Sequence, residues 1–217
     1  MGEIKQHRQS SPVFRPLVAF DFDGTLTSRD SFTTFLEWRA GRGTYVAGLL
    51  HLLPALARYG VDRDRGRLKA AAARRFLAGL TRAELEAETQ AFAAEQGRAL
   101  LRPDALRAWR RWQGEGARLV IVTATPEIVV APIARGLGAD LLIGTRLAFD
   151  AADRVTGDFV GPNCRGPEKA RRLREAFGPD VALAAAYGDT DGDTEMLALA
   201  EEKGMKVFNG TAKMAQL

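Results

Sequence analysis

Three clusters of acidic and hydroxyl side chains could carry phosphoryl chemistry. The segment 21–27 (Asp-Phe-Asp-Gly-Thr-Leu-Thr) follows one apolar run, 123–125 (Thr-Ala-Thr) follows a second, and 188–193 (Gly-Asp-Thr-Asp-Gly-Asp) follows a third. Lys169 opens an expected helix between the second and third clusters. Because sites in open parallel sheets lie at the carboxyl ends of strands, we expect these residues to meet in one site.

The residue types suit transfer of a phosphoryl group. Mg²⁺ prefers carboxylate oxygens, waters and phosphate, and Asp21 and Asp189 could share one ion. The ion would offset the repulsion between an attacking carboxylate and a phosphate, and the attack would form an aspartyl phosphate. Asp21 and Asp23 are two residues apart, so on a regular strand they would share a face and place a proton donor beside the nucleophile. Lys169 and the Thr123 hydroxyl could hold the transferring group.

Alternative interpretations of these clusters fit less well. The segment 188–193 could open a calcium-binding loop, because aspartates occupy its first, third and fifth positions. The sixth position would need Gly but is Thr194, and the twelfth would need Glu but is Ala200. We therefore expect Asp191 to be a loop residue. The segment 21–27 alone could be a strand followed by an ordinary Asp-Gly turn, but the other clusters argue against this.

The scarcity of histidine and cysteine excludes other chemistries. The chain has two His and one Cys among 217 residues. A structural zinc site needs about four such ligands, and one thiol forms no internal disulfide. His7 lies in a polar leader and His51 in an apolar run, so a histidine general base is not indicated. We expect Cys164 to be inert.

The elements that must position these residues alternate between apolar strands and helices. We expect strands at 17–23, 118–123, 140–144, 181–187 and 205–208, helices at 103–113, 126–136, 168–177 and 194–202, and a hairpin at 147–160 with its turn near 151–154. This alternation predicts an α/β fold with a Rossmann-like, doubly wound parallel sheet.

An all-helical stretch interrupts this alternation. Glycines and a proline divide residues 31–102 into roughly four short helices, with a capping box at Thr81 and Glu84. We predict that 31–102 is an insertion and that 16–30 and 103–217 form the core. Residues 1–15 carry charges without an apolar segment, so we expect a poorly ordered leader and not a secretory signal.

The segment 20–27 resembles the first motif of the haloacid dehalogenase-like hydrolases, and all four motifs of that family occur in order from about Val18. The resemblance implies that Asp21 is the nucleophile and Asp23 the general acid and base, whose carbonyl also binds Mg²⁺. It implies that Thr123 and the Ala124 amide bind phosphate and that Lys169 is the third-motif lysine. Asp189 would be a metal ligand, and Asp193 a second carboxylate that orients a metal-bound water or Lys169.

The insertion after the first motif resembles the C1 cap of the phosphoserine phosphatase-like branch. Segments 123–127 and 163–169 resemble subfamily IB, which includes phosphatidylglycerophosphatase C-like and CicA-like proteins. Serine phosphatases of this branch usually carry a Glu that contacts the substrate amine, where this chain has Asp30. Arg74 or Arg75 lies roughly where those enzymes bind the substrate carboxylate. These three residues are the candidates for cap specificity.

Charge and hydropathy bear on whether the protein binds nucleic acid, anionic substrates or a membrane. The formal net charge is +4, and no block of like charges indicates nucleic-acid binding. A basic surface could instead attract anionic substrates or lipids. The apolar run 46–57 contains Pro54 and is too short to span a bilayer. We expect a cytoplasmic protein, with peripheral contact at the inner face of an anionic membrane as an alternative.

We therefore predict a Mg²⁺-dependent phosphomonoesterase that acts through an aspartyl phosphate. Its substrate would be a lipid phosphate such as phosphatidylglycerophosphate, or a soluble compound of the phosphoserine kind. The alternative from another class is a phosphate-binding regulatory protein without turnover, against which the intact set of Asp21, Asp23, Lys169 and Asp189 argues. The oligomeric state is not indicated.

Overall fold

A computed structural model describes residues 15–211. Its centre is a five-stranded parallel sheet in the order β3-β2-β1-β6-β7. The strands are β1 (Leu17–Phe20), β2 (Arg118–Pro126), β3 (Leu141–Thr145), β6 (Leu183–Gly188) and β7 (Ala200–Met205). The doubly wound α/β fold expected from the sequence is confirmed. Of the predicted leader only Arg15 is described, and residues 1–14 lie outside the described part.

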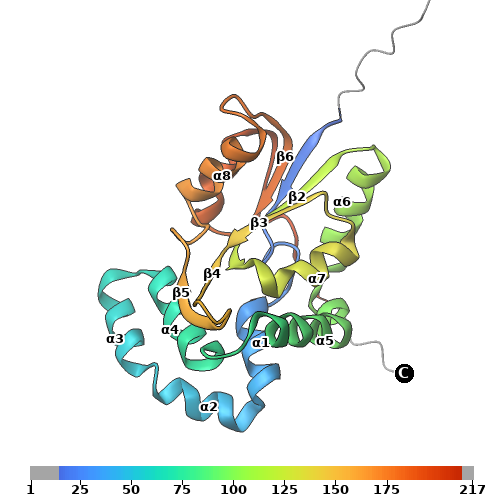
Figure 1. The fold of residues 1–217 in the computed structure, drawn as a ribbon. Coiled ribbons are helices and arrows are strands. Elements are labelled where there is room, and N and C mark those ends of the chain that lie inside the picture. Colours follow the sequence, from blue (N-terminus) through green and yellow to red (C-terminus); the bar gives the residue numbers. More distant parts are fainter. Residues whose placement is uncertain (1–14, 212–217) are drawn as a thin grey trace, which may run out of the picture.

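Helices cover both faces of the sheet, as Figure 1 shows. On one face, Val18 and Phe20 of β1 join an apolar cluster with α6 (Pro103–Gly114) and α7 (Glu127–Leu137). On the other face, Ala19 joins a cluster with α8 (Pro167–Phe177) and α9 (Thr194–Leu197). Successive residues of a strand point to opposite faces, so each apolar run contributes side chains to both clusters.

The C-terminal end of the fold differs from the sequence prediction. Helix α9 ends at Leu197, and the last strand β7 covers Ala200–Met205, where a helix to residue 202 and a strand at 205–208 were expected. The sequence of β7 is Ala-Glu-Glu-Lys-Gly-Met, with both glutamates and the lysine exposed. Because β7 is an edge strand, it can carry charges that would be unfavourable in the middle of a sheet.

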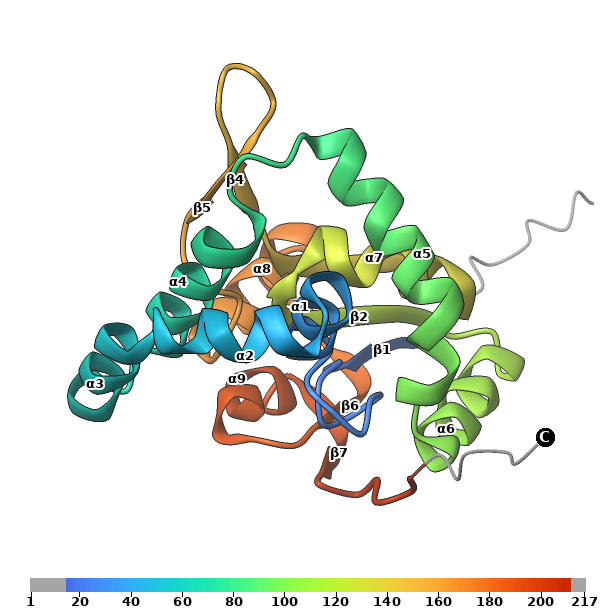
Figure 2. The ribbon, with the colours of Figure 1, turned by 90° about the horizontal axis from the view of Figure 1, so that it is seen from below.

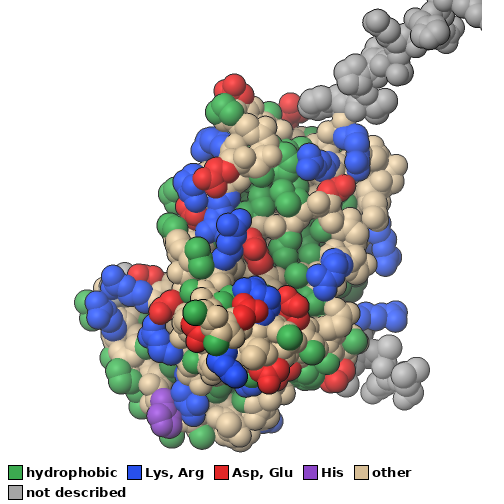
Figure 3. Space-filling view, in the orientation of Figure 1, with side chains coloured by type: hydrophobic (Ala, Val, Ile, Leu, Met, Phe, Trp, Pro, Cys, Tyr) green, Lys and Arg blue, Asp and Glu red, His purple; other side chains and the backbone are tan. Residues whose placement is uncertain are grey.

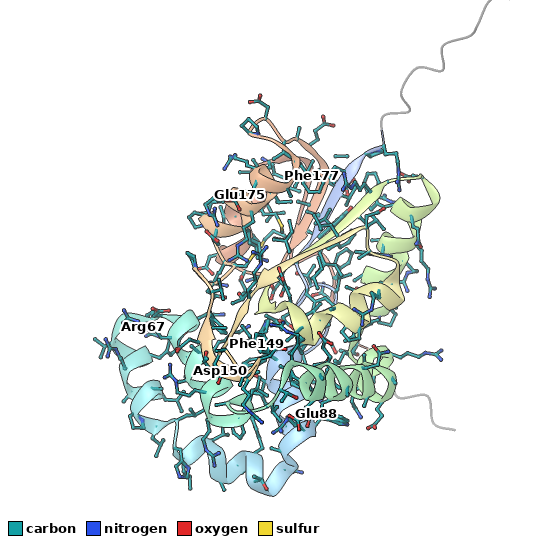
Figure 4. The ribbon with its side chains drawn as sticks, viewed as in Figure 1. Arg67, Glu88, Phe149, Asp150, Glu175 and Phe177 are labelled. Carbon is teal, nitrogen blue, oxygen red and sulfur yellow. The ribbon has the colours of Figure 1, made fainter. Side chains whose placement is uncertain are left out.

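A two-stranded antiparallel hairpin follows β3. It consists of β4 (Leu147–Phe149) and β5 (Val155–Phe159), and its turn lies at 150–154 as expected. Figure 4 labels Phe149 and Asp150 at this turn, beside the helices that follow β1. The hairpin packs against α4 (Arg65–Leu77), and Thr81 forms an isolated bridge with Arg154.

The segment between β1 and α6 is helical, and we call residues 31–100 the helical insertion. It contains α1 (Ser31–Ala40), α2 (Arg42–Leu50), α3 (Leu53–Asp62), α4 and α5 (Arg82–Leu100). The five helices compare with roughly four expected, and one break falls where neither glycine nor proline stands: α3 ends at its C-cap Arg63, which has a left-handed conformation, and Asp64 caps α4. Asp30 and Asp64 cap α1 and α4, and Thr81 forms the predicted capping box of α5.

The helical insertion shares its hydrophobic core with the sheet. Phe35, Phe76 and Phe92 belong to the same buried cluster as Phe20 and Trp109. Figure 2 shows α5 running alongside α7, and these helices are in contact. Within residues 15–211, no helix has both the length and the apolar character needed to cross a membrane.

Candidate active site

A pocket of about 260 Å³ lies where the strand ends meet the helical insertion. Three loops of the core line it, after β1, before α8 and after β6, together with the end of β2, the first turn of α8 and residues of the insertion. The lining residues are Asp21, Asp23, Gly24, Ser28, Arg29, Asp30, Arg65, Lys69, Thr123, Ala124, Asn163, Arg165, Lys169, Asp189, Thr190 and Asp193. The structure thus gathers every predicted catalytic, phosphate-binding and metal-binding residue in one pocket.

A buried lysine links two of the aspartates. The Nζ of Lys169 donates to Asp21 Oδ1 at 2.5 Å, to Asp193 Oδ1 at 2.6 Å and to the Val122 carbonyl at 2.7 Å. Burial would lower the pKa of Lys169, but the two carboxylates outweigh it and raise that pKa. Lys169 is therefore a fixed positive charge at the end of β2.

Asp21 lies directly after β1 and is 6% exposed. Thr25 donates a hydrogen bond of 3.2 Å to its Oδ2. Burial raises the pKa of Asp21 to about 7, against the opposing charge of Lys169 and with the help of Asp193. A nucleophilic carboxylate must be ionised, and further positive charge near Asp21 would favour that form.

Asp23 takes its position from a loop contact and not from strand geometry. Strand β1 ends at Phe20, so the expectation that Asp21 and Asp23 share the face of a regular strand was wrong. The Asp23 oxygens accept from the Ser31 amide at 2.7 Å and from the Thr125 hydroxyl at 2.6 Å. Burial, then the charge of Asp30, raises the pKa of Asp23. A raised pKa suits a carboxyl group that donates a proton near neutral pH.

The loop after β6 supplies two further carboxylates. Asp193 is buried, and its Oδ2 accepts from the amides of Asp189 and Thr190 at 3.1 and 3.0 Å. Its Oδ1 faces Lys169, so both oxygens are occupied. Burial and the charge of Asp193 raise the pKa of Asp189, which is partly exposed in the pocket.

The donor set fits a hard divalent cation. One oxygen each of Asp21, Asp189 and Asp193 lies within 4.8 Å of the others. Carboxylate oxygens are the ligands that Mg²⁺ prefers. The raised pKa values of Asp21 and Asp189 reflect the burial and crowding of negative charge that such an ion would relieve.

The end of β2 forms another wall of the pocket. Thr123 is fully buried, and its Oγ1 accepts from the Thr125 amide at 3.1 Å. The carbonyl of Ala124 accepts from the Thr145 hydroxyl at 3.0 Å, which holds the 123–125 segment against β3. Both Thr123 and Ala124 line the pocket, where the sequence predicted a phosphate site.

The predicted specificity residues divide into two groups. Asp30 lines the pocket, caps α1 through the Thr33 amide at 2.7 Å and lies 3.7 Å from Lys69 Nζ. Arg74 and Arg75 do not line the pocket. Arg74 pairs with Asp158 of the hairpin, and the guanidinium of Arg75 lies 5.4 Å from the ring centroid of Phe76. Both lie near the end of α4, whereas Lys69, one turn or more earlier, faces the site.

A family model described as haloacid dehalogenase-like hydrolase matches residues 18–198. The chain belongs to this hydrolase family. The hydrolase resembles protein CicA of Caulobacter vibrioides, with 60% identity over 89% of this chain and 87% of that protein. It is 34% identical to a phosphoserine phosphatase of Halobacterium salinarum, over 83% of this chain and 81% of the relative. Family and relatives together identify an enzyme of the phosphatase class.

A solved structure from Bordetella pertussis Tohama I, described as a protein with unknown function, has the same fold as this hydrolase. Its TM-score is 0.72 at 26% identity, over 85% of this chain and 86% of that one. The expected resemblance to the haloacid dehalogenase-like family and to CicA-like proteins is thereby confirmed.

Sequence reasoning missed several residues that line or support the pocket of this hydrolase. Thr25 and Thr125 lie within segments already singled out. Thr125 is two residues from Thr123 on the same strand, so the spacing could have predicted that both face the site. Arg165 likewise lies within the segment 163–169 already singled out. Arg65 and Lys69 could not be recognised, because they are two of 31 basic residues and their approach to the site depends on the fold.

Proposed function

We propose that this phosphatase is a Mg²⁺-dependent phosphomonoesterase that acts through an aspartyl phosphate on Asp21. The observation that carries the proposal is the buried contact of 2.5 Å between Asp21 and Lys169, in one pocket with the carboxyl group of Asp23. A buried carboxylate beside a fixed ammonium can attack phosphorus while a separate carboxyl group handles the proton.

Two steps complete the proposed reaction. First, an Asp21 oxygen attacks phosphorus, the bond from phosphorus to the leaving oxygen breaks, and that oxygen takes a proton from Asp23. Next, water attacks phosphorus and gives a proton to Asp23, and the bond between phosphorus and Asp21 breaks. Inorganic phosphate leaves, and both carboxyl groups return to their first state. Lys169, Thr123 and the Ala124 amide hold the transferring group.

Asp21, Asp189 and the Asp23 carbonyl would hold the ion, with Asp193 orienting Lys169 and the loop behind them. Bound Mg²⁺ supplies positive charge that offsets the repulsion between Asp21 and the phosphate. The predicted cap, residues 31–102, contains the helical insertion and would exclude water from the pocket.

Replacement of the nucleophile tests the proposal. Asp21→Asn keeps the shape of the side chain but cannot form the acyl phosphate, so turnover of p-nitrophenyl phosphate should fall below detection while the circular dichroism spectrum is unchanged. The exposed Asp180 offers a matched control, because Asp180→Asn removes one carboxylate away from the pocket and should keep full activity. Full activity in Asp21→Asn would overturn the mechanism.

We infer further that the substrate carries an apolar portion, as a lipid phosphate such as phosphatidylglycerophosphate does. A second cavity of about 310 Å³ lies inside the helical insertion, and we call it the apolar chamber. It shares Asp30, Arg65 and Lys69 with the catalytic pocket. Its other lining residues are Phe32, Thr33, Leu36, Tyr45, Leu49, Leu52, Leu56, Tyr59, Leu68, Ala72 and Phe76. An alkyl chain attached to a phosphate could extend from one cavity into the other.

The alternative is a soluble substrate of the phosphoserine kind, which the relative from Halobacterium salinarum favours. Asp30 already accepts a hydrogen bond from the Thr33 amide and pairs with Lys69, so it is less available to bind a substrate amine. A series of alkyl phosphates of increasing chain length, used below their critical micelle concentrations, distinguishes a lipid-like substrate from a soluble one. We expect kcat/KM to rise with chain length and to exceed the value for phosphoserine.

Leu49 lines the apolar chamber, whereas Leu53, four residues away, does not. Leu49→Asn should flatten the dependence on chain length, and Leu53→Asn should preserve it. A higher kcat/KM for phosphoserine than for every alkyl phosphate would instead support the soluble substrate.

We also propose peripheral contact with an anionic membrane. Five large apolar side chains of α2 and α3 are exposed, namely Val46, Leu50, Leu53, Leu56 and Val61. Exposed arginines lie on the same stretch, including Arg42, Arg58 and Arg63. Figure 3 shows green and blue side chains interspersed along the lower left of the molecule, where Figure 1 places these helices. An apolar surface mixed with cationic side chains suits the interface of an anionic bilayer.

A further inference from the structure

A chain of hydrogen bonds leads from the helical insertion to Asp23. Lys69 of α4 donates from Nζ to Thr125 Oγ1 at 3.1 Å, and Thr125 donates from that hydroxyl to Asp23 Oδ2 at 2.6 Å. Thr125 is fully buried, and 19% of the Lys69 side chain is exposed. These contacts join the insertion to the end of β2 beside the reacting groups.

The chemistry of the three groups fixes the direction of each hydrogen bond. An ammonium group can only donate, so the Thr125 oxygen accepts from Lys69. The single proton of that hydroxyl is then directed to Asp23. The other Asp23 oxygen accepts from the Ser31 amide at 2.7 Å. Two donors on opposite oxygens therefore hold the plane of the Asp23 carboxyl group, which lines the pocket.

We propose that Thr125 and Lys69 are positioning residues for Asp23, and that Lys69 makes the orientation of the acid depend on the helical insertion. This inference rests on the proposed function, in which Asp23 protonates the leaving oxygen. Neither residue gives or takes the transferred proton. Asp23 loses that proton to the leaving oxygen and regains one from water, while the Thr125 proton stays on its own oxygen.

The leaving group reports on the orientation of the acid. Nitrophenolate is a stable anion and departs with little help from an acid, whereas phenolate and alkoxides need a proton. The value of kcat/KM covers the steps up to departure of the leaving group, so it isolates this half of the reaction. We therefore compare p-nitrophenyl phosphate with phenyl phosphate, which has nearly the same shape.

Thr125→Val removes the hydroxyl and keeps the branched shape. We expect kcat/KM for phenyl phosphate to fall by about 10–100-fold, since general acid catalysis and its geometry contribute on that scale. For p-nitrophenyl phosphate we expect a fall of less than about threefold. Thr125→Ser restores the hydroxyl and should restore most of the activity toward phenyl phosphate. Lys69→Met should show the same pattern with a smaller difference between the substrates.

Arg65 provides the matched control, because it is a second cation of the insertion that lines the same pocket, whereas the hydrogen bond to Thr125 comes from Lys69. Arg65→Met removes one positive charge and should change kcat/KM by the same factor for both substrates. Equal losses for both substrates in Thr125→Val, or failure of Thr125→Ser to restore activity, would overturn the inference. Asp21→Asn distinguishes failure of the positioning role from failure of the proposed function. If Asp21→Asn is inactive but Thr125→Val affects both substrates equally, only the positioning role is refuted.

Discussion

At the scale of single residues, the pocket is defined by charged groups that include Lys169 and four aspartates. Lys169 forms ion pairs with Asp21 and Asp193, and the carboxyl groups of Asp189 and Asp23 line the same pocket. Burial, with the charge of Asp193, raises the pKa values of Asp21 and Asp189 although the ammonium of Lys169 acts in the opposite direction. The same arrangement that makes Asp21 a candidate nucleophile therefore makes the pocket a candidate cation site.

Binding of Mg²⁺ should stabilise the fold, because the native protein places the carboxylates of Asp21 and Asp189 and the Asp23 carbonyl together, and the unfolded chain does not. At a concentration of about 100 times Kd, the gain is about 2.7 kcal/mol. For a chain of this length it raises Tm by roughly 5–10 °C. Differential scanning fluorimetry with and without Mg²⁺ measures this shift.

The variant Asp189→Asn should lose most of the shift, whereas Asp180→Asn should keep it. A wild-type Tm that does not respond to Mg²⁺ would refute the proposed metal site. This readout does not depend on turnover, so it separates metal binding from catalysis.

At the scale of the elements, the contact between α4 and the hairpin decides where Lys69 lies. Gly157 of β5 has a φ of 90°, and a Cβ at this position would overlap the backbone of Arg74. Glycine thus permits the close approach of the two elements. Arg74 is used here in packing and in its ion pair with Asp158, which explains its distance from the pocket.

Gly157→Ala should be more destabilising than Gly161→Ala. Both glycines have positive φ, at 90° and 75°, but an added Cβ at Gly161 would meet no atom within 4 Å. The conformational strain common to both is about 1–2 kcal/mol. Overlap with α4 should add about 1–3 kcal/mol for Gly157→Ala. Urea denaturation measures both, and equal losses would show that the close approach contributes nothing.

The molecule as a whole combines a polar pocket, an apolar chamber and an exposed apolar surface within one unit. The chamber and the exposed side chains of α2 and α3 belong to the same helices. A phosphatase acting on a lipid phosphate would need its cap to meet the bilayer. The arginines of this stretch would add electrostatic attraction to anionic headgroups.

Sedimentation with vesicles tests membrane contact at this scale. We expect binding to vesicles that contain phosphatidylglycerol, weaker binding to neutral vesicles, and release by salt. Replacement of Leu50 and Leu53 together by Asp should reduce binding by at least about tenfold, because it removes apolar burial and adds repulsion. Val160 is also exposed, on the hairpin side, and Val160→Asp is the control that should bind normally. Equal sedimentation of the wild-type protein and both variants would contradict the proposed surface.

The sequence by itself determined four of the five strands of the sheet, the order of the motifs and the family. Short apolar runs that end in Asp21, Thr123 and Gly188 indicate strands buried on both faces, and parallel strands bring their carboxyl ends to one edge. Local patterns of this kind depend on neighbours in the chain, so they can be read without coordinates. The capping box at Thr81 and the hairpin after β3 were predicted for the same reason.

Only the tertiary structure decided which basic residues face the pocket and where the last strand lies. Lys69 and Arg74 are alike in the sequence, but the packing of α4 turns one toward Thr125 and the other toward the hairpin. Strand β7 is polar and becomes a strand only because β6 offers it an edge. The apolar chamber likewise exists only between helices. These features depend on contacts between distant segments, which side-chain type and spacing along the chain do not specify.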